Sequence, residues 1–349
     1  MPNTGNHKDI VFSQAPCRVD LAGGTVDLWP LYLFHPGAVV VNLALTVLTT
    51  CRITPTPGKQ IYLKSLDTGR EEKFASFTEL CGTTKFRHPL AAHLVKFFAP
   101  EGGFRMETNS ESPAGAGISG SSALMIASTA ALAKFTGREM GLEDTRVLAQ
   151  NIEAQLIEVP TGCQDYYSAL YGGASAIHLD PDGIHREAIP VPLEEIDSRF
   201  VLAYTGAPRK SGINNWEVFK AHIDGNRKVH RNFDSITAIA QAMHKALGNA
   251  QWEEVARLLR EEWKLRRTNA PGITTPYIDS LIATARKNGG VAAKVCGAGG
   301  GGCVIFMAKE GGRERVEEAL RAAKATILPF QVSREGLSVE RISASQRAQ

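Results

Sequence analysis

Glycine and serine are concentrated between Pro113 and Ala123, where the sequence reads PAGAGISGSSA. A loop with few side chains lets an anion approach backbone N–H groups closely, and a helix that begins at its end adds a favourable dipole. Ser121 and Ser122 supply hydroxyls that could cap this helix or contact a phosphate or a metal ion. The stretch is therefore a candidate cradle for the phosphates of a nucleotide.

Local sequence leaves two other interpretations of this stretch open. The spacing from Gly115 to Gly120 resembles the phosphate loop GxxxxGK[ST], but Ser121 occupies the position of the lysine, which weakens that interpretation. The stretch could also be a flexible turn followed by a helix cap. Residues elsewhere in the chain are needed to decide among them.

Charged residues in three other stretches could assist a transfer reaction. Arg18 and Asp20 are two apart in a strand-like run and share one face of that strand, although an arginine in an apolar strand is more often a paired structural residue. Asp165 falls in the first turn of a predicted short helix, where it could be functional or could serve only as an N-terminal carboxylate. Glu153 lies on a predicted helix, and periodicity does not distinguish it from a solvated glutamate.

Two further stretches could contact a ligand. The sequence GAGGGG at 297–302 lies between the apolar runs VAAKVC and CVIFM, so we expect a loop that packs tightly against another backbone or a ligand. Arg209 and Lys210 follow a buried strand and could bind an anionic or polyhydroxylated ligand or form a solvated loop. Asp27 follows the turn at Gly23, where by itself it is a plausible turn cap.

Strands and helices of ordinary length are predicted to position these residues. Strands are expected at 15–22, 38–53, 104–108, 174–179 and 200–205 and on both sides of the glycines at 297–302; helices are expected at 124–136, 142–159, near 164, and at 233–247, 250–267 and 276–288. The proline-rich, acidic segment 180–199 is the most plausible boundary. Because 349 residues are many for one core, we predict two domains, 1–195 and 196–349.

The composition is that of an ordinary globular protein. With 39 basic and 36 acidic residues the net charge is only +3, which gives no case for a nucleic-acid-binding protein. The N-terminal residues lack the apolar core of a signal peptide, and the most apolar run, 38–48, is too short to span a bilayer. The six cysteines form no CxxC pair. We therefore expect a cytoplasmic protein without a membrane partner.

Three motifs taken together resemble those of the GHMP kinases, the superfamily of galactokinase, homoserine kinase, mevalonate kinase and phosphomevalonate kinase. The first reads RVDLAGGTVDLWP followed by AVVVN, the second GISGSSA, and the third runs from Lys294 to the last glycine of GAGGGG. Their order and spacing over residues 15–307 carry the resemblance. GCQDYYSALYGG and YTGAPRKSG are most similar to the branch of D-glycero-D-manno-heptose 7-phosphate kinases and fucokinase-like enzymes.

The chain departs from the family pattern at two places. The second motif has Ser119 where the family form GLGTSSA has glycine, and Gly120 follows it. The usual GGGTD of the first motif reads GGTVD and ends at Asp27. The first departure touches the nucleotide loop and the second touches the expected sugar pocket.

The resemblance implies an α+β fold of two domains, with ATP and the acceptor in the cleft between them. It assigns proton acceptance or hydroxyl orientation to Asp165, charge compensation to Arg18, and Mg²⁺ binding to Ser122 and Glu153. The nucleotide phosphates would contact Gly115, Gly117, Ser119, Gly120, Ser121 and Ser122, and the acceptor would contact Gly24, Thr25, Asp27, Gln164, Arg209, Gly299 and Gly300.

The leading hypothesis is accordingly an ATP- and Mg²⁺-dependent kinase of a sugar or sugar phosphate, with heptose 7-phosphate or a related sugar as the best candidate. The expected partner is this small molecule, and the protein is expected to be a monomer or homodimer. One alternative is a mevalonate-type kinase of an isoprenoid precursor. The other is a non-catalytic binding protein with the same fold.

Overall fold

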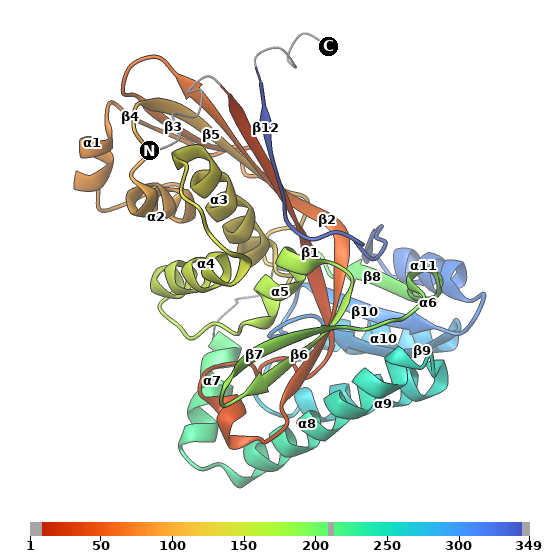
Figure 1. The fold of residues 1–349 in the computed structure, drawn as a ribbon. Coiled ribbons are helices and arrows are strands. Elements are labelled where there is room, and N and C mark those ends of the chain that lie inside the picture. The colour runs from red at the N-terminus through yellow and green to blue at the C-terminus, as the bar shows by residue number, and fades with distance from the viewer. Residues whose placement is uncertain (1–8, 209–212, 344–349) are drawn as a thin grey trace.

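The structure is a computed structural model that describes residues 9–208 and 213–343. It contains two β-sheets with helices packed around them (Figure 1). The first part of the chain forms β1 (Ile10–Ala22), η1 (Leu31–Phe34), β2 (Val39–Thr56), β3 (Ile61–Ser65), β4 (Glu71–Phe74), α1 (Phe77–Gly82), α2 (Pro89–Phe98), β5 (Gly103–Ser110), α3 (Gly120–Thr136), α4 (Leu142–Ile157), α5 (Gln164–Tyr171), β6 (Ala174–Asp180) and β7 (Gly183–Ala188). The second part forms α6 (Leu193–Arg199), β8 (Phe200–Tyr204), α7 (Ile213–Ile223), α8 (Arg227–Gly248), α9 (Trp252–Arg266), α10 (Pro276–Lys287), β9 (Gly290–Val295), β10 (Cys303–Ala308), α11 (Arg313–Ala322), β11 (Thr326–Leu328) and β12 (Ser338–Ile342).

The long antiparallel pair β1 and β2 runs through the middle of the molecule (Figure 1). One half of β2 pairs with β5, and its other half pairs with β6, so a single strand serves two parts of the eight-stranded sheet. The register of β1 shifts between Pro16 and Cys17 and again after Asp20. These irregularities lie on either side of Arg18, the residue that the sequence marks as functional.

The second sheet has the order β11-β8-β10-β9, and its central strands β8 and β10 carry apolar side chains on both faces. Alternate side chains of β8 point to opposite faces, so Phe200 and Leu202 join one hydrophobic cluster while Val201 and Ala203 join the other. Helices α9 to α11 pack against this sheet, in the lower and right parts of Figure 1, and α8 packs against α9, β1 and β2. The uninterrupted apolar runs of β8 and β10 follow from burial on both faces.

Helix α3 is the buried element behind the glycine loop. It packs against β1 and β2, and its residues from Ala123 to Ala133 are buried except Leu124. The many alanines allow this close approach to the sheet, and the helix ends at Gly137, which has the left-handed φ of 73°. The loop is thereby fixed to the core of the first sheet.

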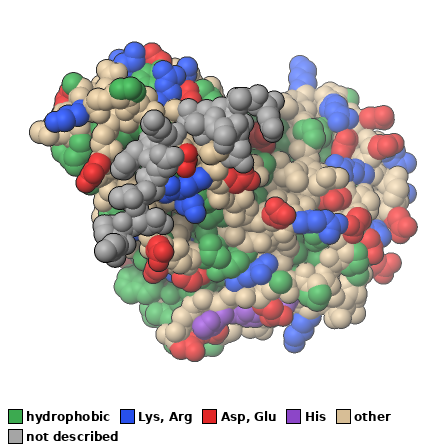
Figure 2. Space-filling model, turned by 45° about the horizontal axis from the view of Figure 1, so that its top comes forward, with side chains coloured by type: hydrophobic (Ala, Val, Ile, Leu, Met, Phe, Trp, Pro, Cys, Tyr) green, Lys and Arg blue, Asp and Glu red, His purple; other side chains and the backbone are tan. Residues whose placement is uncertain are grey.

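The chain returns to the first sheet at its end, because β12 pairs with β1. The first sheet therefore contains residues from both sides of position 195, and the domain boundary there stays a prediction. The expected α+β fold is confirmed. Among the residues that the structure describes, no helix combines the length and the apolar character needed to cross a membrane. Basic and acidic side chains are interspersed on the face drawn in Figure 2.

Candidate active site

The loop between β5 and α3 has the backbone that the glycines were expected to allow. Gly115 and Gly117 adopt φ values of 70° and 79°, in the left-handed region that side chains disfavour. Helix α3 then starts at Gly120, so the loop ends at a helix N-terminus. Residues 113–117 and 119–121 line a cavity of about 410 Å³, into which a phosphate chain could extend.

Ser119 adopts the left-handed φ of 70° although it is not a glycine. This conformation explains why the family pattern has a glycine at this position. Gly120 is constrained differently, because a Cβ there would lie 2.9 Å from Cβ of Ser112. Ser119 therefore strains the backbone, whereas the glycine at position 120 avoids a steric clash with Ser112.

We expect Ser119→Gly to raise the free energy of unfolding by about 1 kcal/mol, because it removes the steric cost of the left-handed conformation. Gly120→Ala should lower it by about 1–3 kcal/mol through overpacking against Ser112. Urea denaturation of both variants checks this. Equal effects of the same sign would contradict the assigned backbone conformation.

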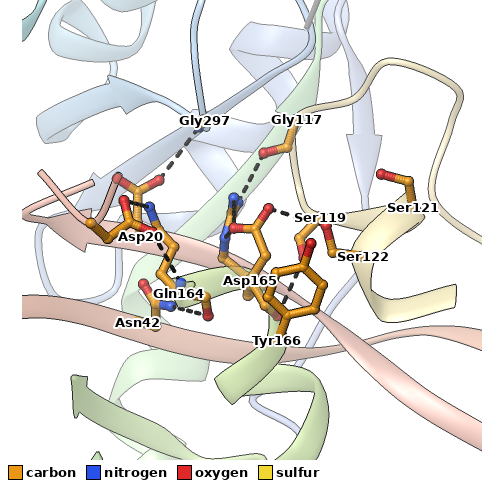
Figure 3. A network of polar contacts seen from close by, with 12 residues as sticks. Asp20, Asn42, Gly117, Ser119, Ser121, Ser122, Gln164, Asp165, Tyr166 and Gly297 are labelled. Carbon is orange, nitrogen blue, oxygen red and sulfur yellow. Dashed lines mark hydrogen bonds and ion pairs between the residues drawn. The ribbon is translucent and has the colours of Figure 1, made fainter. Parts of the chain in front are cut away.

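Asp165 is held beside this loop by Arg18. The Nε of Arg18 donates to Oδ1 of Asp165 at 2.7 Å, Nη2 contacts the same oxygen, and Nη1 donates to the carbonyl of Gly117 at 3.0 Å. Ser122 donates to Oδ2 of Asp165 at 3.4 Å, and Figure 3 shows the carboxylate between the loop serines and α5. Arg18 is buried, whereas the Asp165 side chain is 24% exposed and lines the cavity. The Asp165 carboxylate is therefore accessible from the cavity, and the buried Arg18 fixes its orientation.

The arginine remains a cation in this environment. Burial alone would lower the pKa of Arg18, but the neighbouring charges of Asp165 and Asp20 raise it above its usual value. The result is a permanent positive charge next to the carboxylate, which also ties the loop carbonyl of Gly117 to β1.

Glu153 of α4 points into the same region from behind the loop. Its side chain is buried, and its two oxygens accept hydrogen bonds from Ser121 at 2.7 Å and from Tyr166 at 2.8 Å. Burial raises the pKa of Glu153, and the hydrogen bonds from these hydroxyls oppose that rise. Ser121 donates to Glu153 and Ser122 donates to Asp165, and the Ser122 hydroxyl also lies near enough to Glu153 to lower its pKa.

Part of the cavity wall comes from segments in which the sequence showed no chemistry. Residues of the β3–β4 turn and of the start of α2 line it, including Asp67, Arg70, Arg87 and His88. The parallel pairing of β3 with β5 brings the turn beside the glycine loop, and no local pattern indicates that contact.

Asp27 and Gln164 form a buried pair next to Asp165. Oδ2 of Asp27 accepts the backbone N–H of Gln164 at 3.0 Å, and Oδ1 accepts its side-chain N–H at 3.2 Å. Asn42 of β2 donates to the carbonyl of Gln164 at 3.0 Å. A Cβ at Gly162 would collide with the Asp27 carboxylate, so a glycine is required there. An acceptor molecule would have to use the remaining lone pairs of Asp27.

Burial raises the pKa of Asp27 to about 6, although the backbone N–H of Gln164 acts in the opposite direction. Between the usual carboxyl pKa and 6, the unfolded chain loses this proton while the folded protein keeps it, so stability falls as pH rises through this window. Asp27→Asn resembles the protonated form. Its free energy of unfolding should rise relative to that of the parent by about 2 kcal/mol as the pH increases from 4.5 to 7. Urea denaturation at several pH values measures this, and parallel stability curves would contradict it.

The third glycine motif packs directly against the loop of the second motif. The N–H of Cys303 donates to the carbonyl of Ala116 at 2.7 Å, and a Cβ at Gly302 would lie 2.5 Å from that carbonyl oxygen. Gly299 and Gly300 lie against the backbone of Ile273. Two motifs far apart in the chain thus meet at the loop. Arg209 lies outside the described residues, and its role stays a prediction.

A buried ion network connects the first motif to the second sheet. Nζ of Lys294 lies 2.5 Å from Asp20 and 3.3 Å from Glu262, and Arg266 contacts both carboxylates. Arg266 also donates to the carbonyl of Gly24 at 2.8 Å. Burial would raise the pKa of Asp20, but Lys294 and Arg266 hold it well below its usual range. This network fixes the backbone of the predicted acceptor loop.

Comparisons with known proteins agree with this geometry. Residues 87–173 match the GHMP kinases N terminal domain, and residues 243–326 match the GHMP kinases C terminal domain. The chain therefore contains both domains of the GHMP kinases, which confirms the resemblance seen in the three motifs.

Individual relatives span most of the chain. A D-glycero-alpha-D-manno-heptose 7-phosphate kinase of Campylobacter jejuni subsp. jejuni serotype O:2 is 25% identical over 343 residues, covering 95% of this chain and 98% of that protein. A mevalonate kinase of Pyrococcus horikoshii is 28% identical over 254 residues, covering 69% of this chain and 70% of that protein. The crystal structure of a D-glycero-D-manno-heptose 1-phosphate kinase from Bacteroides thetaiotaomicron superposes with a TM-score of 0.74 at 23% identity, over 96% of this chain and all of that one.

Proposed function

We propose that this protein is an ATP- and Mg²⁺-dependent kinase that transfers the γ-phosphate of ATP to a hydroxyl of a sugar or sugar phosphate. The observation that carries the proposal is the Asp165 carboxylate, which Arg18 holds at the edge of a cavity lined by the glycine loop. A base beside a phosphate cradle is the arrangement that in-line phosphoryl transfer needs. The heptose 7-phosphate kinase relative makes a heptose 7-phosphate the first acceptor to test.

In this proposal the protein acts mainly by positioning. Backbone N–H groups at 115–122 bind the α- and β-phosphates, as the left-handed loop backbone and the helix N-terminus favour. Asp165 accepts a hydrogen bond from the acceptor hydroxyl and takes its proton as the hydroxyl oxygen bonds to the γ-phosphorus and the bond from that phosphorus to the bridging oxygen breaks, which releases ADP. Arg18 orients Asp165, and its bond to the carbonyl of Gly117 couples that orientation to the loop.

The donor set beside the loop fits a magnesium ion. The Glu153 carboxylate and the Ser122 hydroxyl are hard oxygen ligands, and burial of Glu153 favours a cation that would offset its charge. Glu153 and Ser122 would hold the ion. When bound, Mg²⁺ neutralises charge on the phosphates.

Glu153→Gln is expected to raise the Mg²⁺ concentration for half-maximal activity by about tenfold or more, because one anionic ligand is lost. Ser121→Ala is the matched control, because it removes a hydrogen bond to Glu153 and leaves the carboxylate in place. ADP release measured against free Mg²⁺ at saturating ATP separates them. An equal shift in both variants would assign Glu153 a structural role instead.

The acceptor is proposed to bind between the first motif and the second sheet. Thr25, Arg266, Asn269 and Gly297 line a small hollow there, close to Gly24 and to Asp27 with its partner Gln164. A coupled ADP-release screen over free hexoses, heptoses, their phosphates and mevalonate tests the function. A specific sugar response is expected. A response to mevalonate alone would favour the isoprenoid-precursor kinase, and MgATP binding without turnover of any compound would favour the binding protein.

A further inference from the structure

Three histidines from separate elements form a buried cluster away from the glycine loop. His35 directly follows η1, His222 lies in the last turn of α7, and His230 lies in the first turn of α8. One ring nitrogen of each lies within 4.8 Å of one from each of the other two. His35 and His222 are both 2% exposed, and the proposed kinase mechanism uses none of the three.

We propose that this cluster binds a divalent transition-metal ion of the zinc class, with His35, His222 and His230 as ligands. Three neutral imidazoles with one open position are a set that Zn²⁺ accepts. The site is distinct in chemistry from the oxygen ligands near the glycine loop, which suit Mg²⁺.

The hydrogen bonds around the cluster prepare His35 and His230 to act as ligands. Nδ1 of His35 donates to the carboxylate of Asp234 at 2.7 Å, so the lone pair of the neutral ring is on Nε2 and points at His222. Nε2 of His230 donates to the backbone oxygen of His222 at 2.8 Å, which puts its lone pair on Nδ1. A carboxylate or carbonyl behind a histidine is the usual support of a metal-ligating imidazole.

His222 contacts both of the other histidines in the cluster. Its Nδ1 is buried without a hydrogen-bond partner among the described residues. Phe34 and Phe233 contact its ring. A buried lone pair without a proton donor is costly, and a cation relieves that cost when the ring turns toward it.

Binding requires the His222 ring to turn. Its Nε2 lies 2.8 Å from Nε2 of His35, and because that nitrogen of His35 carries a lone pair, Nε2 of His222 donates the hydrogen of this bond. The His222 ring is also stacked on the His230 ring, with the ring centroids 3.8 Å apart. A turn of the His222 ring out of this stack brings the lone pair of its Nδ1 toward the ion. The ion would then fix the segment after Asp27 against α7, on either side of the hollow lined by Thr25 and Asn215.

The test uses the full-length protein after treatment with a chelator, in excess Mg²⁺ so that oxygen sites are filled. Zn²⁺ binding is measured by competition with a chromogenic chelator, and Co²⁺ is added separately as a spectroscopic probe. We expect one Zn²⁺ per chain, a Co²⁺ visible spectrum typical of tetrahedral nitrogen ligation, and a higher melting temperature with Zn²⁺.

Two variants and one control make the result decisive. His222→Ala should abolish the zinc-dependent rise in melting temperature, and Asp234→Asn should weaken Zn²⁺ binding about 10–100-fold through loss of the contact to His35. Because Asp234 is 65% exposed, its substitution keeps the test informative if His222→Ala fails to fold. His178→Ala, in a second group with Glu187 and His244, should leave binding unchanged. Binding of less than one equivalent, or binding that Asp234→Asn does not weaken, would overturn the proposal and leave a hydrogen-bonded histidine cluster.

Discussion

Asp165→Asn is expected to lower kcat about 10²–10⁴-fold, the usual contribution of a general base, while the KM for ATP changes little. Asparagine keeps an oxygen that can accept from Arg18, so the loop that this arginine ties to β1 should remain in place. The loss therefore falls on proton acceptance and not on nucleotide binding. Steady-state ADP release and calorimetric titration with MgATP measure the two effects separately.

The control for this prediction is Asp279→Asn, the same chemical change at a residue whose ion pair with Arg267 lies far more exposed. This variant should keep nearly full activity. Circular dichroism and thermal unfolding establish that Asp165→Asn is folded. Near-full activity of the Asp165→Asn protein would exclude Asp165 as the proton acceptor.

Lys294→Met is expected to lower the free energy of unfolding by about 3–5 kcal/mol, the cost of removing one partner from a buried ion pair. Lys294 and both of its carboxylate partners, Asp20 and Glu262, have fully buried side chains. Without the ammonium, Arg266 is the cation that still contacts both carboxylates. Because Arg266 also holds the carbonyl of Gly24, the acceptor loop should loosen together with the core.

A double variant tests whether charge is the cause. Adding Glu262→Gln to Lys294→Met removes one uncompensated charge and should recover part of the lost stability. Lys287→Met, at an exposed position of α10, should change stability by less than about 0.5 kcal/mol. Additive losses in the double variant, measured by urea denaturation, would show that packing and not charge dominates.

The elements around the loop were predictable because their signals are local. The strand 104–108, the helix that ends at Gly137 and the restart of a helix near Gln164 all appear in the structure at those places. Glycines with left-handed φ values at 115 and 117 and the helix start at Gly120 follow from residue type. Each of these depends on residues close in sequence, so pattern and propensity were sufficient.

Contacts between distant segments were not predictable from one sequence. Asp20 and Lys294 are 274 positions apart, and nothing in the local pattern of α9 distinguishes Glu262 and Arg266 from core-facing neighbours. Glu153 shows the same limit, because helical periodicity does not reveal that the loop and Tyr166 bury it. Glu153 was singled out because the family resemblance assigns a role to its position. The residue pattern itself does not show that its side chain is buried.

The most direct test of the central claim is detection of the product. The protein is incubated with MgATP and D-glycero-D-manno-heptose 7-phosphate, or with the best sugar from the screen, and the mixture is analysed by mass spectrometry. The proposed function predicts a sugar product heavier by one phosphate group, formed in equal amount with ADP and far more slowly by the Asp165→Asn variant. ATP consumption without a phosphorylated sugar, or phosphorylation of mevalonate alone, would contradict it.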